Sequence, residues 1–204
     1  MINVVIPTRG LINVDTLNSV RANGVDMNNI YMGRGDLPDI QNTLTRKALA
    51  GGPAYIWFVE DDMIIPEHTL EHMMKLTRSI VAVDYPLDNG NSTIVTHNDE
   101  IMWCGLGCTL VNATVLNKIG HPYFSTDHSW LIHEPFRLEK KPYPNKYGGH
   151  DINFCLDARE IGYNITKLEG VQAGHMRTES VQRVQTNSGA YEFRALELTK
   201  QSEV

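Results

Sequence analysis

The residues of this chain with the clearest chemical potential are three adjacent acids, Glu60, Asp61 and Asp62. They follow an apolar run, YIWFV at 55–59, whose composition fits a strand buried on both faces. Adjacent carboxylates repel one another, and a divalent cation would relieve that repulsion. Because Mg²⁺ and Mn²⁺ prefer oxygen ligands, the strand end predicts a metal that carries a phosphorylated ligand. These residues alone leave open the alternative of a solvated acidic turn without a metal.

A second arrangement lies just downstream, where HTLEH at 68–72 fits the H-x-x-E-H pattern of some zinc peptidases. On a helix, His68 and His72 would share one face and could bind zinc, with Glu71 as the general base. The pattern marks no third ligand, and it leaves the neighbouring acids unexplained. Exposed helix histidines are therefore the favoured interpretation, with a zinc peptidase as the alternative.

The composition of the whole chain limits the classes of function. Its 204 residues suit one domain, or one domain with a tail, and 42% hydrophobic residues suffice for a core. A formal net charge of −6 without a long basic run does not favour broad nucleic-acid binding. No apolar stretch approaches the length of a membrane span, and the N-terminal run is too short for a signal peptide. Three cysteines, an odd and low number, suggest reduced thiols in a cytoplasmic setting.

Short apolar runs and segments of helical spacing alternate through the first half of the chain. The runs predict strands at 3–7, 28–33, 54–59 and 80–87, and the helical spacing predicts helices at 13–24, 39–52 and 66–79. This order implies an α/β fold with a mostly parallel central sheet and helices on both faces. Ligands of such sheets bind at the carboxyl ends of strands, which is where the acids lie.

The second half is less regular. It predicts a strand passing into a short helix at 113–119, a long irregular loop at 121–149, a helix from 150 to Gly162 and a last strand leading to His175. A further helix is expected at 189–201.

Five short motifs, taken in order, resemble the GT-A class of glycosyltransferases, and especially its small family 2-like members. They are NVVIPTRG at 3–10, WFVEDDMIIP at 57–66, WCGLGCTLVNATVLNKIG at 103–120, GGHDINFCLDAREIGY at 148–163 and AGHM at 173–176. The second corresponds to the D-x-D motif of that class. The resemblance implies a single GT-A (Rossmann-like) domain over 1–176 and a C-terminal tail over 177–204. Residues 1–100 would form the nucleotide-sugar-binding half and 101–176 the acceptor and catalytic half.

The resemblance also implies roles for the matched residues. Those that would meet the nucleotide are Pro7, Thr8, Arg9, Asp36, Glu60 and Asp61. Glu60 or Asp61 would hold the ribose, or the metal through water. Asp62 would ligate a divalent metal on the sugar-nucleotide diphosphate, and His175 would add a nitrogen ligand that favours Mn²⁺ over Mg²⁺. The residues expected against the acceptor and donor sugars are Trp103, Gly105 and Gly107, although Trp103 equally fits a core position beside a tight turn.

Asp151 would be the general base that takes the proton from an acceptor hydroxyl, and a single in-line attack would invert the sugar. The family usually has Glu before this Asp and another Asp two positions after it. This chain has His150 and Asn153 there. A retaining mechanism therefore stays open, as does an ordinary acid favoured by a helix N-terminus.

The sequence thus predicts a metal-dependent glycosyltransferase, with Mn²⁺ or Mg²⁺, that transfers a sugar from a UDP- or GDP-sugar to an acceptor hydroxyl. A non-catalytic sugar-nucleotide-binding protein of the same fold is the second interpretation, because a fold alone does not give activity. The sequence does not distinguish a glycan, a lipid, a protein or a modified DNA base as the acceptor, and it leaves the oligomeric state open.

Overall fold

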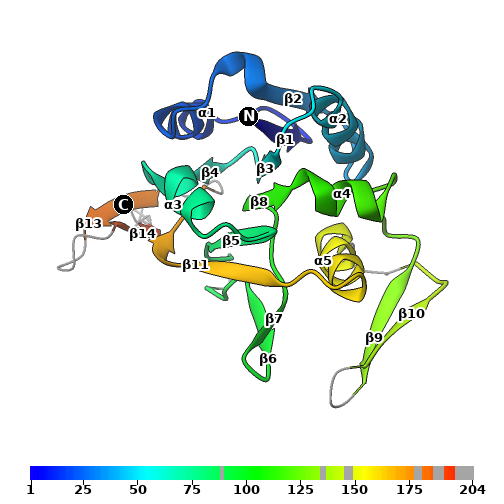
Figure 1. Cartoon of the computed structure of the whole chain (residues 1–204). Helices are drawn as coiled ribbons and strands as arrows, with labels where there is room; N and C mark the ends of the chain where they lie inside the picture. The colour runs from blue at the N-terminus through cyan, green and yellow to red at the C-terminus, as the bar shows by residue number, and fades with distance from the viewer. Residues whose placement is uncertain (88–89, 134–136, 145–148, 177–180, 186–190, 196–204) are drawn as a thin grey trace, which may run out of the picture.

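A six-stranded sheet forms the centre of the computed structural model (Figure 1). The structure describes residues 1–87, 90–133, 137–144, 149–176, 181–185 and 191–195, the last two segments by their backbone alone. The strands of the sheet are β1 (Ile2–Thr8), β2 (Ile30–Arg34), β3 (Tyr55–Val59), β5 (Ile80–Asp84), β8 (Cys108–Asn112) and β11 (Ile165–Gln172). The helices are α1 (Val14–Ala22), α2 (Asp39–Ala50), α3 (Thr69–Lys75), α4 (Ala113–Ile119) and α5 (His150–Glu160), with a 3₁₀ turn at Met27–Asn29.

The strand order across the sheet is β11-β5-β8-β3-β1-β2. β1 lies between β2 and β3 and is parallel to both, and β11 is parallel to β5. β8 is antiparallel to β3 on one side and to β5 on the other. Every strand except β8 therefore runs in one direction, which confirms the predicted mostly parallel sheet. The carboxyl ends of β1 and β3 consequently meet at one edge of the sheet.

Helices cover both faces of the sheet, as the alternating sequence pattern predicts. Helices α2, α4 and α5 pack against one face, together with Ile56 and Phe58 of β3. Helices α1 and α3 pack against the other face, together with Trp57 and Val59. These four side chains are at most 1% exposed. The run YIWFV is continuously apolar because both faces of β3 are buried.

A small two-stranded pairing closes the edge of the sheet where the acids lie. β4 (Met63–Ile64) directly follows them and pairs antiparallel with β12 (Gly174–His175), so that His175 lies opposite Met63. The Met176 N–H also donates to the Asp62 carbonyl at 2.7 Å. This pairing brings a residue from the far end of the chain beside the acids.

Two β-hairpins occur where the sequence predicts a single strand and an irregular loop. β6 (Val95–His97) pairs with β7 (Glu100–Trp103), so the predicted strand ahead of α4 is two separate strands, β7 and β8. β9 (Ser129–His133) and β10 (Arg137–Lys141) pair within the predicted irregular loop at 121–149. A His133–Glu139 ion pair of 2.7 Å links the latter two strands. Polar partners of this kind give no apolar alternation from which the hairpin could be predicted.

The tail also differs from its prediction. β13 (Val181–Gln185) and β14 (Tyr191–Ala195) form an antiparallel hairpin, so a helix at 189–201 is wrong for residues 191–195. The sequence YEFRA of β14 alternates apolar and charged residues, which is the period of a strand. Residues 186–190 and 196–204 lie outside the described part of the chain. No helix among the described residues is long and apolar enough to cross a membrane.

Candidate functional site

A cavity of about 780 Å³ opens at the carboxyl ends of β1 and β3, a volume within the usual range for small-ligand sites. It collects side chains from the ends of β1, β3 and β12 and from the first turn of α5. The predicted site residues that line it are Pro7, Arg9, Glu60, Asp61, Asp62, Asp151 and His175. Segments far apart in the sequence therefore meet at one place, as the order of the motifs predicts.

Three side chains in this cavity are close enough to hold one metal ion. One ligand atom from each of Glu60, Asp62 and His175 lies within 4.8 Å of the other two. The His175 Nε2 is 3.3 Å from the Asp62 Oδ2 and 3.9 Å from the Glu60 Oε2. Two carboxylate oxygens and one imidazole nitrogen suit a divalent cation such as Mn²⁺. Glu60, predicted to contact the ribose, or the metal through water, thus joins the group of possible direct ligands.

Burial and the neighbouring carboxylates both disfavour the ionised form of Glu60. Withdrawal from water is the main cause that raises the pKa of Glu60 to about 7, and Asp62 is the next. Asp151 and Asp61 act in the same direction, whereas His175 opposes them. The Glu60 side chain is still 40% exposed, so a ligand in the cavity can reach it. A bound cation would favour the ionised form of this carboxyl.

The surrounding elements hold Glu60 and His175 in place. The Glu60 N–H donates to the Gly107 carbonyl at 3.2 Å, which ties the end of β3 to the turn before β8. The His175 side chain is only 4% exposed, and its ring meets the Tyr85 ring edge-on, with 5.4 Å between centroids. The ligand group is therefore held by the sheet edge rather than by a free loop.

Asp61 lines the cavity and also accepts hydrogen bonds that connect β1, β3 and α1. Its carboxylate accepts a hydrogen bond from the Thr8 hydroxyl. Its carbonyl accepts from the Asn13 N–H at 2.9 Å and from the Thr16 hydroxyl at 3.1 Å. Asp61 and Thr8 therefore connect the ends of β3 and β1 to the start of α1. Thr8 is buried and does not line the cavity.

Asp36 and Trp103 are also outside the cavity wall. The Asp36 carbonyl accepts the Ile40 N–H at 3.0 Å ahead of α2, and the next residue, Leu37, is the one that reaches the cavity. Trp103 ends β7 and packs, partly buried, against the core. The structure thus supports the core alternative for this tryptophan.

Gly105 and Gly107 leave room for the Tyr85 side chain rather than for a ligand in the cavity. A Cβ on Gly107 would lie 2.6 Å from the Tyr85 ring carbon Cζ, and Gly105 faces the same phenol. The Gly107 N–H donates to the Tyr85 hydroxyl at 3.0 Å. Only Leu106, between the two glycines, reaches the cavity. The close approach that only glycine permits is therefore made to Tyr85.

The first turn of α5 presents Asp151 to the cavity. Gly149 precedes the helix with φ 88°, a left-handed conformation that suits glycine. The Asp151 Oδ1 accepts the Ile152 N–H at 2.8 Å, which orients the carboxylate. Burial lowers the pKa of His150, with Asp151 opposing and Arg9 adding to the effect. His150 is consequently neutral at pH 7, and Asp151 has no imidazolium beside it.

Asn153, where the family usually has an Asp, serves the structure. Its amide is 1% exposed. It donates to the carbonyls of Ser125 at 2.9 Å and His128 at 2.8 Å. A carboxylate has no N–H to donate, so it could not make these two bonds. The departure from the family pattern therefore fixes the 125–128 segment against α5 and leaves the cavity unaffected.

One lining residue was not predicted from the sequence. Gln41 on α2 is 2% exposed and lines the cavity. Its side-chain amide can donate and accept hydrogen bonds, so its place in the wall suits contact with a polar ligand. Gln41 shares the apolar helix face of Leu44 and Ala48, and an amide on that face is the signal that could have revealed it.

The H-x-x-E-H pattern does not build a site in the described part of the chain. His68 precedes α3 with φ 65°, and its side chain is 71% exposed. Glu71 is paired with Lys75 at 2.7 Å. Among the described residues no third ligand joins these side chains. Exposed histidines, the favoured interpretation, fit this geometry.

Comparison with solved structures identifies the fold. The crystal structure of A197 from STIV superimposes with a TM-score of 0.63 at 15% identity, over 93% of this chain and 92% of that one. TarS 1-349 of S. aureus, in complex with UDP-GlcNAc, gives a TM-score of 0.55 at 14% identity, over 88% of this chain. The match spans 59% of TarS 1-349. No protein-family model and no curated protein sequence matches the chain. The fold is therefore GT-A-like, as the order of the motifs predicts.

Proposed function

We propose that this protein is a metal-dependent glycosyltransferase that uses a nucleotide-diphosphate sugar, a UDP- or GDP-sugar, as its donor. The observation that carries the proposal is the convergence of Glu60, Asp62, His175 and Asp151 in one cavity at the sheet edge. A structure with a similar fold, TarS 1-349, was solved in complex with UDP-GlcNAc, which supports a donor of this class. Arg9, Pro7 and Gln41 line the part of the wall next to β1 and α2, and we assign them to the nucleotide.

Glu60, Asp62 and His175 would hold the divalent cation, which we assign as Mn²⁺ in preference to Mg²⁺ because one ligand is a nitrogen. When bound, the cation offsets the negative charge that develops on the departing diphosphate. The three side chains fit this use, since their ligand atoms lie within 4.8 Å of one another and two of them are carboxylates.

The three described cysteines are free thiols, which supports a reducing, cytoplasmic setting.

In the proposed transfer step, the protein itself accepts one proton. An acceptor hydroxyl oxygen attacks the anomeric carbon and forms the new glycosidic bond, while the bond from that carbon to the diphosphate oxygen breaks. The hydroxyl proton passes to the Asp151 carboxylate, and the bonding electrons leave with the nucleoside diphosphate. One in-line displacement inverts the anomeric configuration. The Asp151 carboxylate is oriented by the Ile152 N–H. Burial favours the uncharged form of His150, so this imidazole does not lower the basicity of the neighbouring carboxylate.

A thermal-unfolding screen tests donor and metal together. UDP-, GDP-, CMP- and TDP-sugars are added with and without Mn²⁺, and a donor at about 100 times its Kd should stabilise the protein by about 2.7 kcal/mol. The variant Asp62→Asn should lose the Mn²⁺-dependent part of the shift. Asp99→Asn, the same change in the turn between β6 and β7 and outside the cavity, serves as the matched control.

Two outcomes would contradict the proposal. A response to every nucleotide that is independent of Mn²⁺ and unchanged in Asp62→Asn would overturn the metal site. Binding of a nucleotide sugar without release or transfer of its sugar to any acceptor or to water would overturn the enzymatic claim. The second outcome would leave a nucleotide-sugar-binding protein of the same fold.

A further inference from the structure

A second cavity, of about 440 Å³, lies at the other end of α5. Its walls come from the end of α4, the segment after Pro122, the hairpin β9–β10 and the last turns of α5. Asp151 and Glu160 lie at the two ends of α5, nine positions and so roughly 13 Å apart along its axis. The two cavities therefore border opposite ends of one rigid element.

Polar contacts around the buried His128 and the partly buried Asp157 hold the wall of this second cavity. The His128 side chain is 10% exposed and lies between two carboxylates, at 3.0 Å from Asp127 and 3.1 Å from Asp157. The Lys140 ammonium of β10 reaches Asp157 at 2.9 Å. The two Asn153 bonds fix the backbone on either side of this group. A polar wall that is preorganised in this way is typical of a binding site.

The chemistry of the cavity selects among ligand classes. Charges of both signs line it, with Lys118 and Lys140 against Asp127, Asp157 and Glu160. The carboxylates would repel an anion, and the ammonium groups would repel a cation. An apolar ligand would remove all of these charged groups from water at a high free-energy cost. A ligand that matches must donate and accept hydrogen bonds at its rim and present small apolar faces.

A sugar ring meets these requirements, because its hydroxyls both donate and accept while its C–H faces are apolar. Apolar surface is present in the wall at Ile119, Leu138 and the Trp130 ring. A smaller recess lined by Glu100 and Arg159 shares Leu138 and Glu160 with the second cavity. The two hollows are therefore neighbours, and together they would suit a chain of sugar units better than a single ring.

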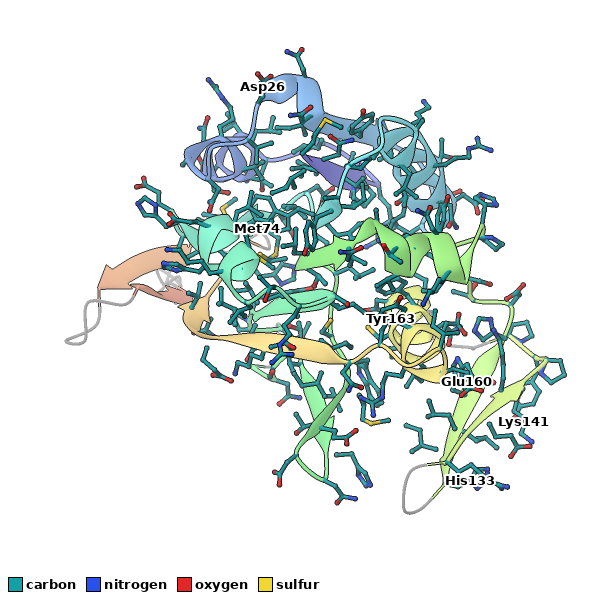
Figure 2. All side chains as sticks on the ribbon, in the orientation of Figure 1. Asp26, Met74, His133, Lys141, Glu160 and Tyr163 are labelled. Atoms are coloured by element: carbon teal, nitrogen blue, oxygen red, sulfur yellow. The ribbon has the colours of Figure 1, made fainter. Side chains whose placement is uncertain are left out.

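Anchoring of the hairpin explains only part of this arrangement. The Lys140–Asp157 and His128–Asp157 contacts attach β9 and β10 to α5 and would serve that purpose with no ligand present. Glu160, labelled in Figure 2, lines both hollows. It makes no ion pair or hydrogen bond among the described residues. The Lys118 ammonium lies over the Tyr163 ring, at 5.0 Å from the centroid, and makes no ion pair with the described residues of the hairpin. These two side chains are therefore not needed to hold the wall.

We propose that the groove formed by the second cavity and its adjoining recess binds a carbohydrate segment of the acceptor, which makes the acceptor an oligosaccharide or a glycan-bearing molecule. The inference rests on the proposed function, because it gives the acceptor of that reaction a chemical class. A glycan with its reacting hydroxyl near Asp151 would have neighbouring units within reach of the far end of α5.

Binding to a printed array of diverse oligosaccharides, measured with the full chain in the presence of UDP and Mn²⁺, tests this assignment. We expect binding to a defined set of glycans, weakened about tenfold by Glu160→Gln and by Lys118→Ala, as for loss of one charge-assisted hydrogen bond. Glu67→Gln is the matched control, since Glu67 is an exposed acid that lines neither hollow. Thermal unfolding of each variant verifies that it folds.

The outcomes separate this inference from the proposed function. Absence of glycan binding across the array, or equal binding by Glu160→Gln and Glu67→Gln, overturns the carbohydrate groove. Binding to a parallel peptide array that is lost in Glu160→Gln overturns it in favour of a protein acceptor. Glycan binding lost in Glu160→Gln, in a protein that binds no nucleotide sugar, supports a carbohydrate groove but overturns the glycosyltransferase proposal and, with it, the assignment of that carbohydrate as an acceptor.

Discussion

At the scale of single residues, the Asp151 carboxylate has two possible roles, one as a general base and one as a stabilising acid at a helix N-terminus. It lines the cavity at the carboxyl ends of β1 and β3, and it also lies in the first turn of α5, where any acid is favoured by the helix dipole. Asp151→Asn keeps the shape but cannot accept a proton. We expect transfer to fall by about 100- to 10,000-fold, the usual contribution of a general base, while binding of the nucleotide sugar persists.

The measurement is the transfer rate at saturating donor, with donor binding followed by calorimetry. If Asp151 were only a helix-terminal acid, Asp151→Asn would cost about 0.3–1 kcal/mol of stability and leave the transfer rate close to that of the parent. Asp15→Asn, which alters an exposed acid in the first turn of α1, is the matched control for the helix effect.

At the scale of elements, the packing of β8 on β5 depends on the turn that carries Gly105 and Gly107. The Tyr85 phenol, 2% exposed, fills the space that a side chain at either glycine would need. We predict that Gly107→Ala destabilises the protein by about 1–3 kcal/mol through overpacking against Tyr85. Chemical denaturation gives this value directly.

A double variant separates the two interpretations of these glycines. If Tyr85 is the cause, Tyr85→Leu should cost less in the Gly107→Ala background than in the parent chain, because the clash has been relieved. If the glycine instead serves a bound sugar, Gly107→Ala would unfold like the parent and lose only transfer. Additive costs of the two changes would contradict the packing explanation.

Elements with a strong local pattern could be predicted from sequence, and elements that depend on distant partners could not. β3 and α2 carry apolar runs or periods long enough to identify them, and the position of the acids after β3 then follows. β4 and β12 have two residues each, which is too short for any period. Their pairing alone shows why His175 meets Asp62, although the order of the motifs predicts that both residues belong to the site. Gln41 was missed for the opposite reason, because it lies on the apolar face of a well-predicted helix.

At the scale of the whole molecule, the charge collected at the sheet edge couples metal binding to stability. The end of β3 and the first turn of α5 bring four acids to one cavity in a chain whose net charge is already −6, namely Glu60, Asp61, Asp62 and Asp151. Folding without a cation must therefore bring like charges together. Withdrawal of Glu60 from water, and then the nearby carboxylates, raise its pKa, so the folded protein retains a proton that the unfolded chain would release.

The sign of the resulting pH dependence follows from the two pKa values. Glu60 titrates near its ordinary value of 4.5 in the unfolded chain and near 7 in the folded one. Between these values the folded state binds more protons, so the stability of metal-free protein should fall as the pH rises towards 7. Mn²⁺ competes with that proton. The stabilisation given by a fixed Mn²⁺ concentration should therefore grow over the same range.

Urea unfolding of chelator-treated protein between about pH 5 and pH 8, with and without added Mn²⁺, measures both slopes. Glu60→Gln should flatten the metal-free slope and remove most of the stabilisation by Mn²⁺, because the amide neither titrates nor offers a charged ligand. Glu67→Gln, at an exposed acid outside the cavity, should change neither. A metal-free slope that survives in Glu60→Gln would place the titrating group elsewhere. Stabilisation by Mn²⁺ that is equal at both ends of the range would show that binding displaces no proton from this site.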